Sequence, residues 1–186
     1  MGLRTKGVKM SVLRKLVSGV ATIGLSALMV GTAFAADPVS PWPGSKHHYN
    51  IYTTDTKLTV TSTFLAPASV TTRYKATAVN VSMVGYSQTA KREDMRLCYT
   101  LPYGTMYAAC TPFSQNVQNQ TVQFDAMGRF QTVDAQGNYT GTRYTAEISA
   151  KGEFTVEHYF PYGIAVAVFN DPGYDTIAVS FVKKPY

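Results

Sequence analysis

The sequence has few of the residues on which enzymes and metal sites usually depend. Its 186 residues include 2 Cys, 3 His and 1 Trp. No spacing typical of a nucleophile elbow, a zinc protease, a phosphate-binding loop or a dinucleotide-binding turn occurs. The 11 carboxylates are scattered, so no pair is favoured as the acid and base of a glycosidase. We therefore expect a protein that is not an enzyme and that has no cofactor and no metal site.

An excess of positive charge is also missing once the first 35 residues are set aside. Five of the 17 Lys and Arg residues lie there, whereas all 11 acidic residues follow, so the rest of the chain carries a net charge of +1. A protein that binds nucleic acid usually carries a basic surface. We expect no nucleic-acid partner.

The three histidines are expected to be structural. His47 and His48 are adjacent, so on extended backbone their side chains point in opposite directions and chelate one ion poorly. His158 alternates with Val156 and Phe160, which places it on the inward face of a strand, where we expect a hydrogen-bonded, partly buried ring. A zinc site joining all three would require distant segments to converge.

The clustered carboxylates are expected to be solvated. Glu93 and Asp94 follow Lys91 and Arg92 in a mixed charge cluster that is typical of a loop. Glu153 and Glu157 stand at alternate positions of a strand, which usually marks its wet side.

The first 35 residues have the order of a secretory signal peptide. A basic head precedes an apolar run over 16–32, and the small-residue sequence Ala33-Phe34-Ala35 closes it. We expect cleavage near Ala36 and export to the periplasm or the cell surface. No apolar run of membrane-spanning length follows, so we expect no integral membrane protein after cleavage.

Residues 36–50 contain Pro38, Pro41 and Pro43 and are expected to form an extended lead-in rather than a central strand. One domain should then cover 51–186. Period-two patterns rich in Thr, Val and Tyr recur there, with turn residues about every ten positions. The strand candidates include 58–64, 74–83, 95–100, 106–110, 121–124, 130–133, 154–160 and 176–182. This pattern predicts an all-β fold, an antiparallel β-sandwich or barrel of immunoglobulin-domain size.

Two local features are predicted within that pattern. The apolar face switches between Ala78 and Val79, which indicates a β-bulge. Lys151-Gly152 separates two alternating runs, 144–148 and 154–160, and predicts a hairpin.

Cys98 and Cys110 are the two cysteines of the chain. An even number in an exported protein favours a disulfide, and their spacing excludes a C-x-x-C redox site. We expect them to close a loop around Pro102-Tyr103-Gly104.

Thirteen tyrosines suggest a recognition surface, since tyrosine is large and amphipathic and loses little conformational entropy when it is fixed in a contact. Tyr103 and Tyr162 occupy Pro-Tyr-Gly turns and are expected at exposed tips. Ile177, Val179 and Phe181 form one apolar face that could pair with another chain if their strand lay at an edge. The expected partner is a protein or a surface glycan.

The C-terminal segment from Gly173 to Tyr186 resembles the last strand of chaperone–usher pilus subunits. The shared features are a glycine fourteenth from the end, the alternation of Ile177, Val179 and Phe181, and a terminal tyrosine. The resemblance implies a subunit of a surface fibre. The chain departs from that family in its mid-chain cysteines and in the prolines of the segment that would donate a strand.

A second resemblance is to the flagellar accessory family FlhE. It rests on Arg73-Tyr74, Leu97-Cys98, Cys110, Phe124 and the terminal stretch Val179–Val182. This likeness implies an all-β, exported, non-catalytic periplasmic protein. The sequence thus predicts an exported, non-enzymatic binding or structural module, such as a subunit of a surface appendage. One alternative is a periplasmic accessory factor of the FlhE type, and a second is an enzyme or toxin component with no recognisable site.

Overall fold

The computed structural model describes residues 41–54, 56–87 and 91–185. The expected signal peptide and its cleavage site lie outside the described residues. Within them, no helix is long and apolar enough to span a membrane.

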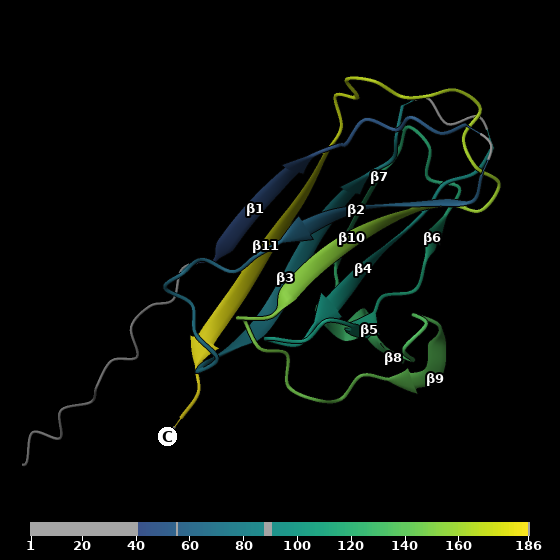
Figure 1. The fold of residues 1–186 in the computed structure, drawn as a ribbon. Coiled ribbons are helices and arrows are strands. Elements are labelled where there is room, and N and C mark those ends of the chain that lie inside the picture. The colour runs from purple at the N-terminus through teal and green to yellow at the C-terminus, as the bar shows by residue number, and fades with distance from the viewer. Residues whose placement is uncertain (1–40, 55, 88–90, 186) are drawn as a thin grey trace, which may run out of the picture. The chain divides into compact units, whose positions relative to one another are not determined.

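Two antiparallel sheets pack face to face as a β-sandwich, which confirms the predicted fold class and selects the sandwich over the closed barrel (Figure 1). The first sheet has the order β1-β11-β3-β7, and the second has the order β2-β10-β4-β5-β8-β9, with β6 against β4. The strands of the first sheet are β1 (Trp42–His47), β3 (Tyr74–Val84), β7 (Thr121–Asp125) and β11 (Tyr174–Lys183). Those of the second are β2 (Leu58–Phe64), β4 (Asp94–Thr100), β5 (Tyr107–Cys110), β6 (Ser114–Gln115), β8 (Gln131–Val133), β9 (Tyr139–Arg143) and β10 (Glu153–Phe160). A short 3-10 turn covers Met127–Arg129.

The core lies between the sheets and is built from the alternating residues of the long strands. Leu97 and Val156 from the second sheet and Val79 and Val179 from the first are fully buried. The β3–β11 ladder shifts register where Ser180 pairs with Ala78 and Phe181 with Ala76, which confirms the predicted bulge.

The proline-rich lead-in contributes a strand to the sandwich. β1 lies antiparallel beside β11 (Figure 1). Pro43 stands opposite Ala178, and the Trp42 ring lies 5.9 Å from that of Phe154 in the core. The first sheet therefore begins at Trp42, not after residue 50 as the sequence suggested. Proline fits because β1 is an edge strand, whose outer side needs no ladder hydrogen bonds.

The hairpin predicted at Lys151-Gly152 is wrong. β9 pairs with β8, β10 pairs with β2 and β4, and the preceding segment makes one isolated bridge, between Ser149 and Lys75. The Ser149 amide instead donates to the Tyr99 hydroxyl at 3.0 Å. Gly152 ends a turn in which its amide donates to the Ser149 carbonyl at 3.1 Å, and a Cβ there would come within 2.2 Å of the Tyr99 ring, so this close approach requires glycine.

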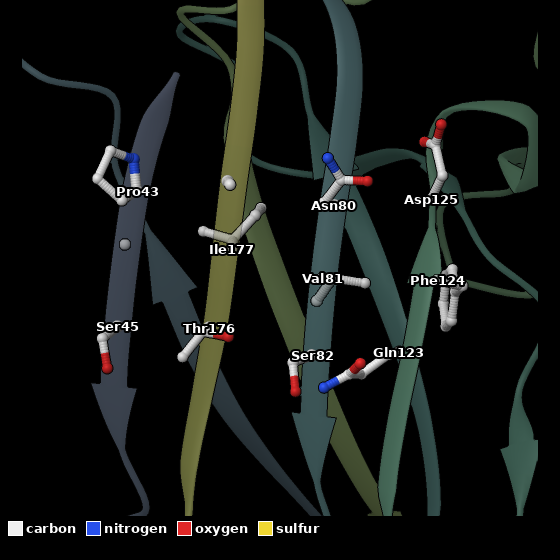
Figure 2. A pocket seen from close by; sticks show the side chains of 12 residues that line it. Pro43, Ser45, Asn80, Val81, Ser82, Gln123, Phe124, Asp125, Thr176 and Ile177 are labelled. Atoms are coloured by element: carbon white, nitrogen blue, oxygen red, sulfur yellow. The ribbon is translucent and has the colours of Figure 1, made fainter. Parts of the chain in front are cut away.

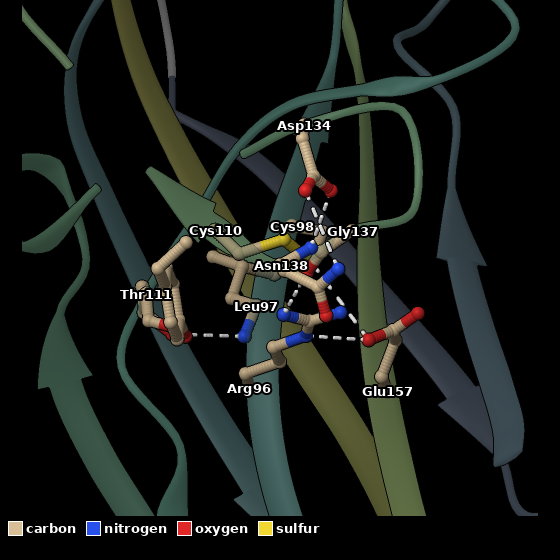
Figure 3. The surroundings of a disulfide bond; sticks show 10 residues. Arg96, Leu97, Cys98, Cys110, Thr111, Asp134, Gly137, Asn138 and Glu157 are labelled. Atoms are coloured by element: carbon tan, nitrogen blue, oxygen red, sulfur yellow. Dashed lines mark hydrogen bonds and ion pairs between the residues drawn. A yellow bond between two sulfur atoms is a disulfide. The ribbon is translucent and has the colours of Figure 1, made fainter. Parts of the chain in front are cut away.

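The predicted disulfide is present. Cys98 and Cys110 are direct partners in the β4–β5 ladder, and an S–S bond of 1.98 Å joins them (Figure 3). Both residues are fully buried. A covalent link thus fixes the strand pair on either side of the turn that carries Tyr103.

A candidate functional site: buried histidines under an aromatic loop surface

Five ionisable side chains meet inside one end of the sandwich. They come from four separate parts of the chain: the residue after β1, the residue before β4, the strand β10, and β11 with the loop before it. All five are between 0% and 4% exposed. They are His48, Glu93, His158, Asp171 and Asp175. We call this set the buried histidine network.

His158 lies between two carboxylates. Its Nδ1 is 2.8 Å from Glu93 Oε1, and its Nε2 is 2.7 Å from Asp175 Oδ2. Burial by itself would lower the pKa of His158, but the two carboxylates outweigh it and raise that pKa to about 9. For Glu93, burial dominates over the hydrogen bond from His158 and raises the pKa above its usual value.

Asp175 is the centre of the network. It accepts hydrogen bonds from Ser62 Oγ at 2.7 Å and from the Val84 amide at 3.1 Å, in addition to its contact with His158. Burial would raise the pKa of Asp175, but the histidines and Ser62 hold it far below the usual value. Because Ser62 and His158 belong to the second sheet and Asp175 to the first, these bonds join the two sheets.

Only one of the two ring nitrogens of His48 has a hydrogen-bond partner among the described residues. Its Nδ1 is 2.8 Å from Asp171 Oδ1, and the ring stacks on Tyr86 with centroids 4.2 Å apart. Nε2 is 3.7 Å from Asp175 Oδ1 and has no hydrogen-bond partner among the described residues. A Cβ at position 173 would come within 2.3 Å of the ring, so Gly173 is required by the packing of His48.

Asp171 connects the network to the loops. It accepts hydrogen bonds from the Ser87 amide and hydroxyl at 2.9 and 2.6 Å and from the Gly173 amide at 2.7 Å. Burial would raise the pKa of Asp171, but these donors and His48 lower it. Tyr86 adds two further links, from its amide to Glu93 and from its hydroxyl to the Tyr49 carbonyl. The buried network therefore fixes the chain at 48–49, 86–87 and 171–173.

Exposed apolar side chains cluster in sequence on the loops at this same end and at the first residue of β11. Six of them are more than half exposed. They are Tyr49, Tyr52, Tyr162, Val166, Phe169 and Tyr174, and we call them the aromatic loop surface. The loops carrying them are paired: Ile51 and Val168 exchange two backbone hydrogen bonds of 2.8 and 2.9 Å, and the rings of Tyr52 and Phe169 lie 5.5 Å apart.

The two tyrosines predicted at turn tips are both exposed, but they lie at opposite ends of the sandwich. In the antiparallel β4–β10 ladder, Thr100 pairs with Glu153 and Asp94 with Tyr159. The turn after β4 therefore lies far from the turn after β10. Tyr162 belongs to the aromatic loop surface, whereas Tyr103, 91% exposed, stands at the other end.

The apolar face predicted on the last strand is core. Ile177, Val179 and Phe181 are 3%, 0% and 9% exposed, and β11 lies between β1 and β3. The condition under which these residues could pair with another chain, an edge position, is not met. They contribute to stability rather than to a contact surface.

The carboxylates expected in solvent are buried instead. Glu93 and Asp94 are 0% and 4% exposed, because Glu93 points inward to His158 and Asp94 is covered by its ion pair with Arg92 and a hydrogen bond from the Asn116 amide. The expectation for His158, a buried and hydrogen-bonded ring, is correct. The burial of Asp175 could have been predicted from the sequence, since Asp175 stands two residues before Ile177 and so falls on the inward face of β11. No sequence pattern predicts the burial of Asp171, since it depends on loop packing.

A second polar cluster lies on the outer face of the second sheet (Figure 3). Arg96 Nε donates to Glu157 Oε2 at 2.5 Å, Arg96 Nη1 donates to the Gly137 carbonyl at 2.9 Å, and the guanidinium lies 4.6 Å from the Phe113 ring centroid. Glu157 was expected on the wet side of β10, but the ion pair and the β8–β9 turn leave it 8% exposed. Every contact here is within the protein, so the cluster is already satisfied.

The outer face of the first sheet forms a shallow groove of about 810 Å³ (Figure 2). Hydroxyl and amide side chains line it in cross-strand rows. One row is Ser45, Thr176, Ser82 and Gln123. The groove is open, and although hydroxyl and amide groups line it, most of its exposed surface is apolar, with no buried ionisable side chain among the residues that line it.

No protein-family model, curated protein or solved structure matches this chain.

Proposed function

We propose that this protein is an exported, non-enzymatic β-sandwich module that binds a protein partner through its aromatic loop surface. The observation that carries the proposal is the combination of exposed aromatic side chains with loops anchored by a buried ionic network. Exposed apolar groups gathered on rigid loops are typical of interaction sites. Loops that are ordered before binding lose less conformational entropy when the partner docks.

The chemistry of the surface favours a protein over a glycan. Tyr52 and Tyr162 combine apolar area with a hydroxyl group, as tyrosines in recognition sites do. Val166 and Phe169 add apolar area that offers no hydrogen bond to a sugar hydroxyl. A protein partner can cover Val166 and Phe169 with apolar side chains and offer hydrogen-bond partners to the hydroxyls of Tyr52 and Tyr162.

The buried network supports a binding role rather than catalysis. The imidazoles of His48 and His158 are enclosed, with side chains 0% and 1% exposed, so a substrate has no direct access to them. Their hydrogen bonds tie loops to strands. The disulfide agrees with export, since such bonds persist in oxidising compartments.

A more specific role, as a surface-appendage subunit, has one structural observation in its favour. The N-terminal β1 lies antiparallel to the C-terminal β11 of the same chain, which is where the pilus-subunit resemblance would place a donated strand. A periplasmic accessory role of the FlhE type is the alternative.

The binding proposal is tested by placing a photo-crosslinking amino acid at position 52 or 162 of the exported protein in its source cells. The matched control carries the same group at position 103, at the opposite end. We expect one discrete protein adduct from positions 52 and 162 and none from 103. With the purified partner, Tyr162→Ala and Phe169→Ala should each weaken binding by at least tenfold, whereas Tyr103→Ala should leave it unchanged. Normal binding by both loop variants, properly folded, would refute the proposal.

The appendage role is tested separately with Ser45→Cys and Thr176→Cys, which place two cysteines opposite each other on β1 and β11. The new disulfide should hold β1 in its own chain. If assembly into a fibre requires β1 to move to a neighbour, the locked protein will not assemble in oxidising conditions and will recover on reduction. Unimpaired assembly of the locked protein excludes strand exchange.

A further inference from the structure

The centre of the buried histidine network has the arrangement of a metal site. One nitrogen from each of His48 and His158 and an oxygen of Asp175 lie within 4.8 Å of one another. Two imidazole nitrogens and a carboxylate oxygen are a common ligand combination for zinc in proteins. The three side chains come from β10, β11 and the residue after β1, so an ion there would join three segments.

The outer partners of both histidines fit this reading. Each ring has its Nδ1 against a carboxylate, Asp171 for His48 and Glu93 for His158, at 2.8 Å in both cases. A histidine that binds a metal usually donates its other ring N–H to a carboxylate or carbonyl, which fixes the tautomer and the ring orientation. Both histidines therefore direct Nε2 toward Asp175.

His48 Nε2 provides an independent observation. It is a buried polar atom without a hydrogen-bond partner among the described residues, although its ring is packed on all sides. Buried polar atoms in proteins are nearly always satisfied, and one that is not calls for an explanation. A cation between His48 and Asp175 would satisfy this nitrogen.

The distances allow such an ion with small side-chain adjustments. Bonds of roughly 2.0–2.2 Å in tetrahedral geometry separate two ligand atoms by about 3.3 Å. Two observed separations lie on either side of that value, each to a different oxygen of Asp175: 3.7 Å from His48 Nε2 to Oδ1, and 2.7 Å from His158 Nε2 to Oδ2. The three ligand atoms all lie within 4.8 Å of one another, so a rotation of the carboxylate and a small inward shift of the rings would bring them to an ion. The shorter contact is a hydrogen bond, and a metal would take the place of its proton, which is released.

We infer that His48, His158 and Asp175 bind a divalent cation of the zinc type, with Asp171 and Glu93 as outer carboxylates. The ion supplies positive charge among three buried carboxylates and locks the loops that carry the aromatic loop surface. This inference does not depend on the proposed protein partner, because a metal site would exist whether or not that surface binds anything.

The test uses the exported protein without a polyhistidine tag. The protein is unfolded with its disulfide intact in the presence of a chelator, refolded with or without zinc chloride, and freed of unbound metal. We expect one zinc ion per chain. A zinc concentration about 100-fold above the dissociation constant should raise Tm by about 5–10 °C.

The key variant is His48→Asn, whose amide nitrogen can replace Nδ1 in the hydrogen bond to Asp171 but which has no group in place of Nε2. The matched control is His47→Asn, one residue away and outside the network. We expect His48→Asn to lose the bound zinc and the Tm rise, and His47→Asn to retain both. Asp171→Asn should weaken zinc binding by about 10–100-fold, as expected for an outer partner.

Two results would overturn the inference: refolded wild-type protein that holds no stoichiometric zinc, or a His48→Asn variant that binds zinc as tightly as wild type. If His48→Asn does not fold, X-ray absorption of the zinc-loaded wild-type protein decides. Two imidazole ligands with oxygen support the site, and any other ligand set refutes it.

Discussion

The two ends of the sandwich are stabilised by different chemistry. At the aromatic end, loops from distant parts of the chain are held by the buried histidine network, through contacts such as His48–Asp171 and His158–Asp175. At the other end, the Cys98–Cys110 disulfide fixes β4 to β5, and the intervening turn closes with a hydrogen bond from the Gly104 amide to the Leu101 carbonyl. One end depends on noncovalent contacts between distant residues, and the other on a covalent link between near neighbours.

This difference separates two ways of stabilising a loop. A disulfide acts largely by restricting the unfolded chain, so it tolerates changes in the residues around it. A buried ionic network depends on every partner being present, because removing one leaves another charge buried and unpaired. The aromatic end should therefore be the more sensitive of the two to single substitutions.

Asp175→Ala should have the largest effect of any single change at the aromatic end. It removes the acceptor of Ser62, Val84 and His158 and leaves three donors, including the buried Nε2 of His158, without a partner, which costs about 3–5 kcal/mol. Calorimetry should show a large fall in Tm. The control is Glu147→Ala, which breaks an exposed ion pair with Lys184 and should cost at most about 1 kcal/mol. Similar Tm values for the two variants would contradict the central role of Asp175.

Replacement of both cysteines, Cys98→Ala with Cys110→Ala, should lower the free energy of unfolding by about 3 kcal/mol, given the separation of 12 residues. Hydrogen exchange should increase in the β4–β5 turn and not in the loop at 161–173. Increased exchange in that loop would show that the two ends are coupled, and would remove the basis of the comparison.

Tyr86→Phe should have a smaller effect on the stability of the aromatic end. It deletes the hydroxyl that donates to the Tyr49 carbonyl at 3.1 Å and should cost about 1 kcal/mol. Faster hydrogen exchange should be confined to the region around residues 49–52. The control is Tyr159→Phe, on the outer face of β10. An unchanged exchange rate near Tyr49 would mean that this hydrogen bond does not order the loop.

Tyr103→Gly should have the smallest effect and the opposite sign. Tyr103 has a φ of 63°, a left-handed conformation that costs an L-residue about 1 kcal/mol and glycine almost nothing. The greater freedom of glycine in the unfolded chain offsets part of this gain. We expect a small rise in Tm that Tyr103→Ala does not reproduce. Equal effects of Gly and Ala would rule out backbone strain as the cause.

The parts of this structure that the sequence predicted are those set by short-range pattern. Alternation located β2 and β11, a face switch located the bulge in β3, and an even cysteine count identified the disulfide. The failures share a different origin. Glu93 follows two basic residues, which predicts a solvated side chain. It is buried instead, because His158, 65 residues away in the sequence, lies opposite it. Period and composition contain no information about such partners.

The prolines of the lead-in at 36–50 led to a second wrong prediction, that this segment forms no strand of the sandwich. Three prolines argue against a central strand, correctly, but they do not exclude an edge strand. Trp42 decided the outcome, since burying its ring against Phe154 brings the following residues alongside β11. In such a polar segment, a single large apolar residue is a stronger indicator of a packed strand than the prolines around it are of a loop.

The pairing of β1 with β11 also determines when folding can be completed. Trp42 has Val179 as its partner, so β1 can complete its pairing only once the segment that forms β11 is available. Closing so long a loop is slow compared with forming hairpins between neighbouring strands. An incomplete chain therefore leaves β1 unpaired and Trp42 exposed. The sandwich therefore closes late in folding, when β1 pairs with this distant segment.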